Sequence, residues 1–275
     1  MASTKEIQNR IKSIKDTMKI TNAMYMISSS KLKKAKKDLE NTEPYFYTLQ
    51  VSLARLLRHL PDMDHLYFEN EDDEKKENPK RGYIVVTADK GMAGAYNHNI
   101  IKIAEEELAN HPDSELYVVG QVGRHYFARK NVPVDIHFQY TAQNPSLHRA
   151  RVIADKMLEN YESGKIDEVY IIYTKMINSV TAEPEMIQLL PFRKMDFKIS
   201  QADVYHEEII IEPSPRAVMD RIVPNYITGF IYGALVESFC SEQNSRMMAM
   251  DSATRSAKDM LADLSIKYNR ARQAA

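Results

Sequence analysis

The residues of this chain that could bind a phosphate lie in segment 87–97, TADKGMAGAYN. The segment follows a β-branched run and precedes a helical one, a place where α/β proteins often bind phosphates. Its glycines, Gly91 and Gly94, match neither the dinucleotide fingerprint nor the phosphate loop that ends in Gly-Lys-Ser/Thr. We therefore expect a tight strand-to-helix turn, with nucleotide binding as the alternative. Segment 120–125, GQVGRH, has the same two interpretations.

The sequence gives little support for nucleic-acid binding, metal binding or catalysis. The basic segment 31–37, KLKKAKK, could suggest a DNA-reading basic helix, but it lies inside a heptad-bearing helix rather than ahead of one, so we expect no nucleic-acid binding. The eight histidines lack metal-ligand spacing. No serine, cysteine or carboxylate pair has the arrangement of a nucleophile or an acid/base couple. The chain alone is therefore predicted to hold no catalytic residue, no metal and no cofactor.

Composition sets the class of protein. The chain has 275 residues, of which 44% are hydrophobic and 27% charged, which suits one or two soluble domains. The longest apolar run, residues 226–236, has about half the roughly 20 residues that a membrane helix needs. The N-terminal sequence MASTKEIQNR lacks the apolar core of a secretory signal, so we expect the protein to stay in the compartment where it is made. The single cysteine, Cys240, cannot form an internal disulfide and is expected to be a small core residue.

Both ends of the chain carry small and apolar residues at alternating spacings of four and three. The N-terminal stripe comprises Ile7, Ile11, Ile14, Met18, Thr21, Tyr25, Ser28, Leu32, Ala35 and Leu39. The C-terminal stripe comprises Ile222, Tyr226, Gly229, Gly233, Val236, Cys240, Gln243, Met247, Met250, Thr254, Ala257, Leu261, Leu264, Tyr268 and Ala271. A mean spacing of 3.5 residues keeps one face of each helix against a partner in a left-handed supercoil. We therefore expect two long terminal helices that pair with each other.

Prolines and capping residues give the expected limits of these helices. Ser3 and Glu6 form a plausible capping box at the start of the first helix, and Pro44 is expected to kink that helix rather than end it. Pro213 and Pro215 introduce the last helix. Gly229 and Gly233 are expected to let another backbone approach closely.

Between the terminal helices, β-branched runs alternate with helical ones, which favours a mostly parallel sheet covered by helices. Strands are predicted at 83–88, 115–120, 134–140 and 168–174, with possible edge strands at 185–192 and 207–212; helices are predicted at 96–109, 122–129 and 146–161. The predicted organisation is a coiled-coil helix over residues 1–60, a linker over 61–81 whose polar part is 69–80, an α/β domain over 82–212, and a second coiled-coil helix over 213–275.

Charge is distributed unevenly along the chain. Residues 1–40 carry ten Lys/Arg against four Asp/Glu, and residues 214–275 carry eight against six, although the net charge is only −1. The middle of the chain is therefore acidic. A basic rod joined to an acidic body suggests electrostatic matching with two different partners, and an ordinary solvated helix face is the alternative for most of the lysines.

Three segments closely resemble the γ subunits of bacterial F-type ATP synthases. They are the C-terminal stretch 237–275, beginning ESFCSEQNSRMMAMDSATRSAK, the N-terminal stretch 7–37, and the turn TADKGMAGAYN. The resemblance implies an antiparallel coiled coil of the two terminal helices, joined to a Rossmann-like α/β domain with a mostly parallel sheet. It implies a non-catalytic rotor shaft that couples proton or sodium flow to ATP synthesis or hydrolysis at the β subunits.

The resemblance also implies partners and a location. The shaft would stand inside a ring of three α and three β subunits, with the α/β domain near the ε subunit and the c-subunit ring. The complex would lie on the cytoplasmic face of the cell membrane, with this chain as a peripheral subunit. The family often has cysteine where this chain has Ala93, so we expect no thiol control. Family members typically continue about a dozen residues beyond the Arg-Gln-Ala that lies just before Ala275.

Individual contact residues follow from the resemblance. Met24 matches the position that faces an acidic loop of the β subunit, and Arg272 and Gln273 match a pair that meets another β loop. Glu212 falls near the region that contacts ε or the c ring. The exposed basic residues Lys33, Lys34 and Lys36 are expected to guide acidic β loops through weak pairs, worth about 0–1 kcal/mol each. An ordinary surface or coiled-coil role is the alternative for each of these residues.

Overall fold

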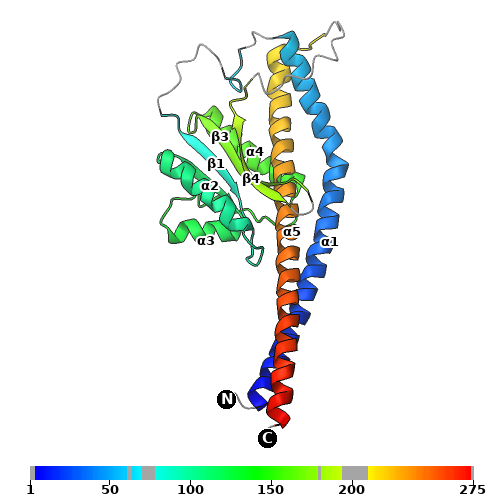
Figure 1. Cartoon of the computed structure of the whole chain (residues 1–275). Helices are drawn as coiled ribbons and strands as arrows, with labels where there is room; N and C mark the ends of the chain where they lie inside the picture. Colours follow the sequence, from blue (N-terminus) through cyan, green and yellow to red (C-terminus); the bar gives the residue numbers. More distant parts are fainter. Residues whose placement is uncertain (1–3, 61–63, 70–77, 179–180, 194–209, 274–275) are drawn as a thin grey trace.

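Two long helices and a smaller α/β body make up the computed structural model, which describes residues 4–60, 64–69, 78–178, 181–193 and 210–273. Helix α1 (Thr4–His59) and helix α5 (Pro215–Gln273) run antiparallel, with both chain ends at the same tip (Figure 1). The body lies against α5 over the upper part of this pair. Below the body the two helices continue with only each other as neighbours in the chain.

The heptad stripes form the seam between α1 and α5. Ile7, Thr21, Ser28 and Ala35 are buried at spacings that are multiples of seven. On the other helix Met250, Thr254 and Ala257 are buried, and the hydroxyls of Thr21 and Thr254 lie 2.7 Å apart across the seam. The prediction of paired termini is therefore confirmed. Tyr25 is an exception, because it is 40% exposed while its neighbour Met24 is half-buried.

Helix α1 continues through Pro44 to His59, as predicted, and α5 contains Pro224. Between these regions the aromatic ring of Phe46 packs directly on Gly229, so that a Cβ atom there would overlap the ring. A Cβ at Gly233 would meet no atom within 4 Å. The prediction that both glycines admit a neighbouring backbone is wrong: Gly229 accommodates an aromatic ring, and Gly233 faces open space.

These two glycines provide a matched pair of substitutions. Gly229→Ala is expected to lower the free energy of unfolding by about 1–3 kcal/mol, because Phe46 must move out of a packed position. Gly233→Ala is expected to raise it by up to about 1 kcal/mol, because alanine favours the helix and meets nothing. Urea unfolding of the full chain measures both effects. A loss for Gly229→Ala that persists unchanged in a Phe46→Ala background would contradict the assignment of the clash.

The body contains a four-stranded sheet in the order β2-β1-β3-β4. Strands β1 (Arg81–Val86), β2 (Glu115–Val119) and β3 (Glu168–Met176) are parallel, and β4 (Ala182–Leu190) is an antiparallel edge strand. The sheet is therefore mostly parallel, as predicted. Alternate residues face opposite layers: Ile84 and Val86 pack in the core shared with α4 and α5, whereas Tyr83 and Val85 pack with α2 and α3.

Helices α2 (Tyr96–Asn110), α3 (Gln121–Arg129) and α4 (Leu147–Glu162) match their predicted positions to within a residue or two. Helix α4 begins where the Ser146 side chain accepts a hydrogen bond from the backbone N–H of Arg149, a capping interaction. One face of the sheet is thus covered by α4 together with the long helix α5. This arrangement makes α5 a component of both the body and the coiled coil.

Two predicted strands are not borne out by the described residues. Segment 134–140 is a turn region with only an isolated bridge between Val119 and Tyr140, because the Asp135 carboxylate accepts hydrogen bonds from the backbone N–H groups of His137 and Phe138. These local bonds turn the backbone away from a strand ladder. In segment 207–212, residues 210–212 are not a strand, and residues 207–209 lie outside the described part.

Part of the predicted linker is packed. His65, Tyr67 and Phe68 are each at most 5% exposed. Phe68 forms a parallel bridge with Phe192, and the Nε2 atom of His65 lies 3.1 Å from the carboxylate of Asp220 on α5. Residues 64–69 therefore fasten the end of α1 to the body and to α5. Much of the polar stretch 69–80, residues 70–77, lies outside the described part.

Candidate partner-contact surface

Side chains of the glycine-containing turn after β1 bind backbone groups of the chain itself. The Asp89 carboxylate accepts hydrogen bonds from the backbone N–H of Gln121, at the start of α3, and from that of Gln143. The Asn97 side chain accepts one from the N–H of Ala88. The Asp89 carboxylate therefore occupies the N-terminus of α3, where it would repel a phosphate. The N-terminus of α2, which follows this turn, has no side-chain cap. The interpretation as a tight turn, with Gly94 and Met92 at positive φ, therefore fits this geometry.

The second turn, at residues 120–125, is closed in the same way. Gly120 has φ 92° and lies against the carbonyl of Thr87. The Thr87 hydroxyl accepts a hydrogen bond from the N–H of Gly123 and donates one to the carbonyl of Val119. Glycine is required at position 120 for its positive φ and for the close approach to Thr87.

A buried ion pair joins α5 to the first turn. Glu242 and Arg246 are 1% and 8% exposed, and their charged atoms Oε1 and Nη1 lie 2.5 Å apart. The Nη2 group of Arg246 also donates to the carbonyls of Lys90 and Gly91, at 3.2 and 3.1 Å. Burial raises the pKa of Glu242, and the neighbouring Arg246 opposes that rise. Sequence reasoning missed this pair; an i,i+4 Glu–Arg spacing was visible, but nothing in the sequence showed that it is buried.

The predicted contact lysines of α1 lie on its outer surface near the body, whereas Met24 lies on the free part of the helix. Lys33, Lys34 and Lys36 are exposed, whereas Met24 is half-buried beside the seam. Lys34 also lines a cavity formed by α1, α5 and the loop before α4, together with Lys31 and Asp38. Lys31 reaches the body by donating a hydrogen bond to the side chain of Gln143. The lysines therefore lie at the level where the body meets the coiled coil.

The remaining predicted residues lie at the two ends of α5. Arg272 and Gln273 are exposed at its C-terminal tip, about 27 Å beyond the Thr254 contact at 1.5 Å per residue. Glu212 is exposed just before the first turn of the same helix. Because α5 has 59 residues, its length of about 88 Å separates the two sites. The structure therefore distributes the predicted contacts along the coiled coil and does not gather them into one site.

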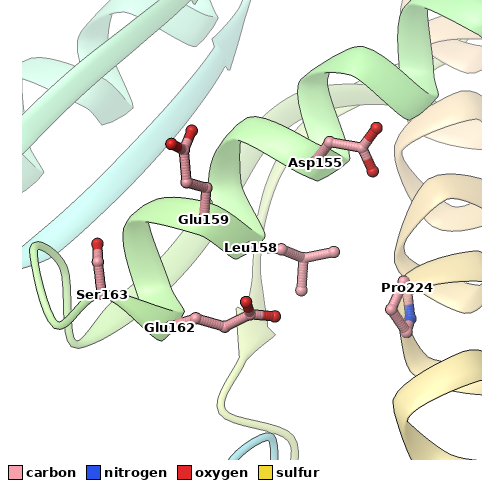
Figure 2. A pocket seen from close by; sticks show the side chains of 6 residues that line it. All are labelled: Asp155, Leu158, Glu159, Glu162, Ser163 and Pro224. Atoms are coloured by element: carbon pink, nitrogen blue, oxygen red, sulfur yellow. The ribbon is translucent and has the colours of Figure 1, made fainter.

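The open pocket between α4 and α5 contains none of the predicted residues. Figure 2 shows Leu158 pointing toward Pro224 across it, with three carboxylates, a serine and these two residues as its lining: Asp155, Glu159, Glu162, Ser163, Leu158 and Pro224. Glu159 pairs with Lys156, and Glu162 accepts a hydrogen bond from the hydroxyl of Tyr67. The bond between Tyr67 and Glu162 joins α4 to segment 64–69, whereas the Lys156–Glu159 pair lies within α4.

Two further kinds of site are absent from the described residues. Within them, no group of three or more His, Cys, Asp or Glu side chains could hold a metal ion. No helix in that part of the chain is both long and apolar enough to cross a membrane.

Comparisons with known proteins agree with one another. The chain has the fold of one chain in the solved structure of the central stalk and c ring of the Tetrahymena thermophila mitochondrial ATP synthase, with a TM-score of 0.63 and 24% identity over 85% of this chain and 99% of that one. The ATP synthase gamma chain of Ruminiclostridium cellulolyticum is 44% identical over 98% of this chain and 92% of its own length. The sodium ion specific gamma chain of Acetobacterium woodii is 32% identical over 99% and 94%. Because the family model described as ATP synthase also matches residues 3–275, this chain belongs to the ATP synthase gamma-chain family.

Proposed function

We propose that this chain is the central rotor shaft of a bacterial F-type ATP synthase and couples ion flow to ATP synthesis or hydrolysis by rotation. The observation that carries the proposal is the pair of antiparallel helices that extends past the body with only each other as support (Figure 1). Beyond Arg246, α5 continues for about 40 Å at 1.5 Å per residue. Gamma chains are non-catalytic stalk subunits, and the catalytic sites of the complex lie in the β subunits.

The seam has the properties that a shaft needs. A single helix bends easily, and mutual burial of two helices stiffens both. Small and polar seam residues such as Thr21, Ser28 and Thr254 keep the two helices close together. Exposed charges on the outside would pair only weakly with a surrounding ring, so that no single angle is trapped.

We also propose which subunits the shaft contacts. The free coiled coil, with Met24, Arg272 and Gln273, would lie inside a ring of three α and three β subunits. The opposite end, with Glu212, would contact the ε subunit and the c ring. In this arrangement the chain would lie at the cytoplasmic face of the membrane as a peripheral subunit. The driving ion is a proton or sodium, since one relative is a gamma chain described as sodium ion specific.

Reconstitution tests the proposed function. Purified chain mixed with the α and β subunits of the same complex is expected to give an assembly with one copy per three αβ pairs, measured by native mass spectrometry. Another stoichiometry, or no assembly, would contradict the proposal. Calorimetric titration of the isolated chain with ATP is expected to show no tight binding, because Asp89 and Thr87 already occupy backbone N–H groups at the start of α3, and the turn before α2 lacks the phosphate-loop pattern.

Charge reversal tests the basic surface on α1. Replacing Lys33, Lys34, Lys36 and Lys37 by glutamate is expected to lower the number of ions pumped per ATP hydrolysed, because attraction to acidic loops becomes repulsion. The loss should shrink as salt rises, since exposed charges are screened over about 10 Å at 0.1 M. A control reverses two lysines on the body, Lys102 and Lys156, whose side chains are 67% and 41% exposed. An unchanged pumping ratio in the α1 variant would count against any guiding role.

A further inference from the structure

We propose that the buried Glu242–Arg246 pair, clamped onto the turn after β1, is the joint that transmits torque between the body and the shaft. This inference rests on the proposed function and identifies the residues through which torque would pass between the body and the shaft. Arg246 is the last residue of α5, among those described, whose side chain hydrogen-bonds to the body. Beyond this residue α5 packs only along the seam (Figure 1).

The joint consists of directional bonds on one face of α5. Arg246 donates to the carbonyls of Lys90 and Gly91 with one nitrogen while another contacts Glu242. A planar guanidinium that contacts three oxygens in this way is fixed in orientation, which a flexible ammonium would not be. Because Glu242 is 1% exposed, water does not compete for its contact with Arg246.

Two serines one helical turn or more above Arg246 extend the joint. The hydroxyl of Ser238 accepts a hydrogen bond from the N–H of Thr174 at 3.0 Å, and that of Ser241 donates to the carbonyl of Thr174 at 3.3 Å. The pairing of β3 with β1 ends at Ile172, two residues before Thr174. The two serines therefore bind the backbone of β3 just beyond its pairing with β1. Both serines are at most 1% exposed. Four hydrogen bonds from α5 therefore hold the end of β3 and the turn after β1.

The chemistry of this contact suits a twisting load. Apolar contacts are non-directional, so they fix the rotation of a helix less tightly than oriented hydrogen bonds do. Hydrogen bonds weaken steeply when their angles change, so they resist rotation of α5 about its own axis. The upper part of α5 packs on the body through apolar residues such as Ile227, Ile231 and Leu235. Rotational stiffness should therefore be concentrated at residues 238–246.

The experiment uses the complete reconstituted complex with a bead attached to the body through Asp113→Cys, an exposed position. Burial raises the pKa of the Cys240 thiol to about 11, so that thiol does not compete for the label. The test variant is Glu242→Gln with Arg246→Gln, which removes both charges, keeps the shape of residue 242 and shortens residue 246. The control is Asp251→Asn with Arg255→Gln, an exposed ion pair at the same i,i+4 spacing on the free shaft.

The readout is the angular variance of the bead during pauses between ATP-driven steps. Losing two of the four hydrogen bonds should lower the rotational stiffness of the joint, so the variance should rise in the test variant and stay unchanged in the control. The proposal would be overturned if the test variant had the same variance as the parent complex, or if the variance rose equally in the control. Absence of stepwise turning in the parent complex would instead contradict the proposed function.

A conservative variant keeps the inference testable if the double variant does not assemble. Arg246→Lys retains the charge beside Glu242 but replaces the planar fork by a single ammonium. It is expected to assemble, to hydrolyse ATP at the parent rate and to show a smaller rise in variance than the double variant. An Arg246→Lys complex that assembles and shows no rise in variance would overturn the assignment.

Discussion

Replacing Arg246 by methionine is expected to lower the free energy of unfolding by about 3–5 kcal/mol at neutral pH, because it leaves the Glu242 carboxylate buried without its cation. Methionine preserves much of the side-chain volume, so the loss would arise mainly from the unpaired charge. Urea unfolding of the full chain measures the effect. Adding Glu242→Gln to Arg246→Met is expected to recover most of the loss, whereas an equally large loss in the double variant would show that packing was responsible.

The same substitution should make stability depend on pH. Burial already raises the pKa of Glu242 above its ordinary 4.5, and Arg246 is the charge that opposes this rise. Without Arg246 the pKa of the folded state rises further, so the folded chain binds a proton that the unfolded chain does not. Relative to the parent chain, Arg246→Met therefore loses the most free energy of unfolding at pH values above this raised pKa. The loss becomes smaller as the pH falls toward 4.5. A deficit that stays constant from neutral pH down to pH 5 would contradict this assignment.

Gly120→Ala is the second substitution with a large expected effect, a loss of about 3–5 kcal/mol. Its φ of 92° with ψ of 147° is a conformation that residues with a side chain adopt only under strain, at about 1–3 kcal/mol. The added Cβ would also overlap the carbonyl of Thr87, and overpacking costs about 1–3 kcal/mol more. Displacing Thr87 would in turn disturb its hydrogen bonds to Val119 and Gly123.

Gly164→Ala is the matched control for Gly120→Ala. Gly164 also has a positive φ, 71°, but a Cβ there meets nothing within 4 Å. Its expected loss is only about 1 kcal/mol, from backbone strain alone. Thermal or urea unfolding of both variants separates the two causes. Equal losses at the two positions would show that the contact with Thr87 adds nothing.

The paired terminal helices and the parallel strands were predictable because their patterns are local and repetitive. The seam residues Thr21, Ser28 and Thr254 are small or polar, yet their spacing alone placed them correctly. Strands β1, β2 and β3 were apparent from β-branched runs, because strands buried on both faces are almost continuously apolar. Segment 134–140 has a similar composition, and only the bonds of Asp135 to the following backbone show that it is a turn.

The function of the glycine-containing turn could not be predicted from its own residues. Its closure depends on Asp89, whose partners Gln121 and Gln143 are far away in sequence. Likewise, Glu242 and Arg246 have the spacing of an ordinary surface pair, and their burial depends on how α5 packs against the body. For the predicted contact residues, position and exposure follow from the helix pattern. Their partners are other chains, so their roles stay predictions.

The contact between Thr21 and Thr254 fixes the register of two helices whose free ends form the same tip. A deletion of one residue in α1 below this contact would rotate the outer part of its stripe by about 100° relative to α5. Lengthening one helix by a heptad would leave its tip without a partner. Length changes in the free shaft should therefore occur as pairs, seven residues in α1 with seven in α5. Related chains of different shaft length are expected to carry such matched insertions in both terminal segments.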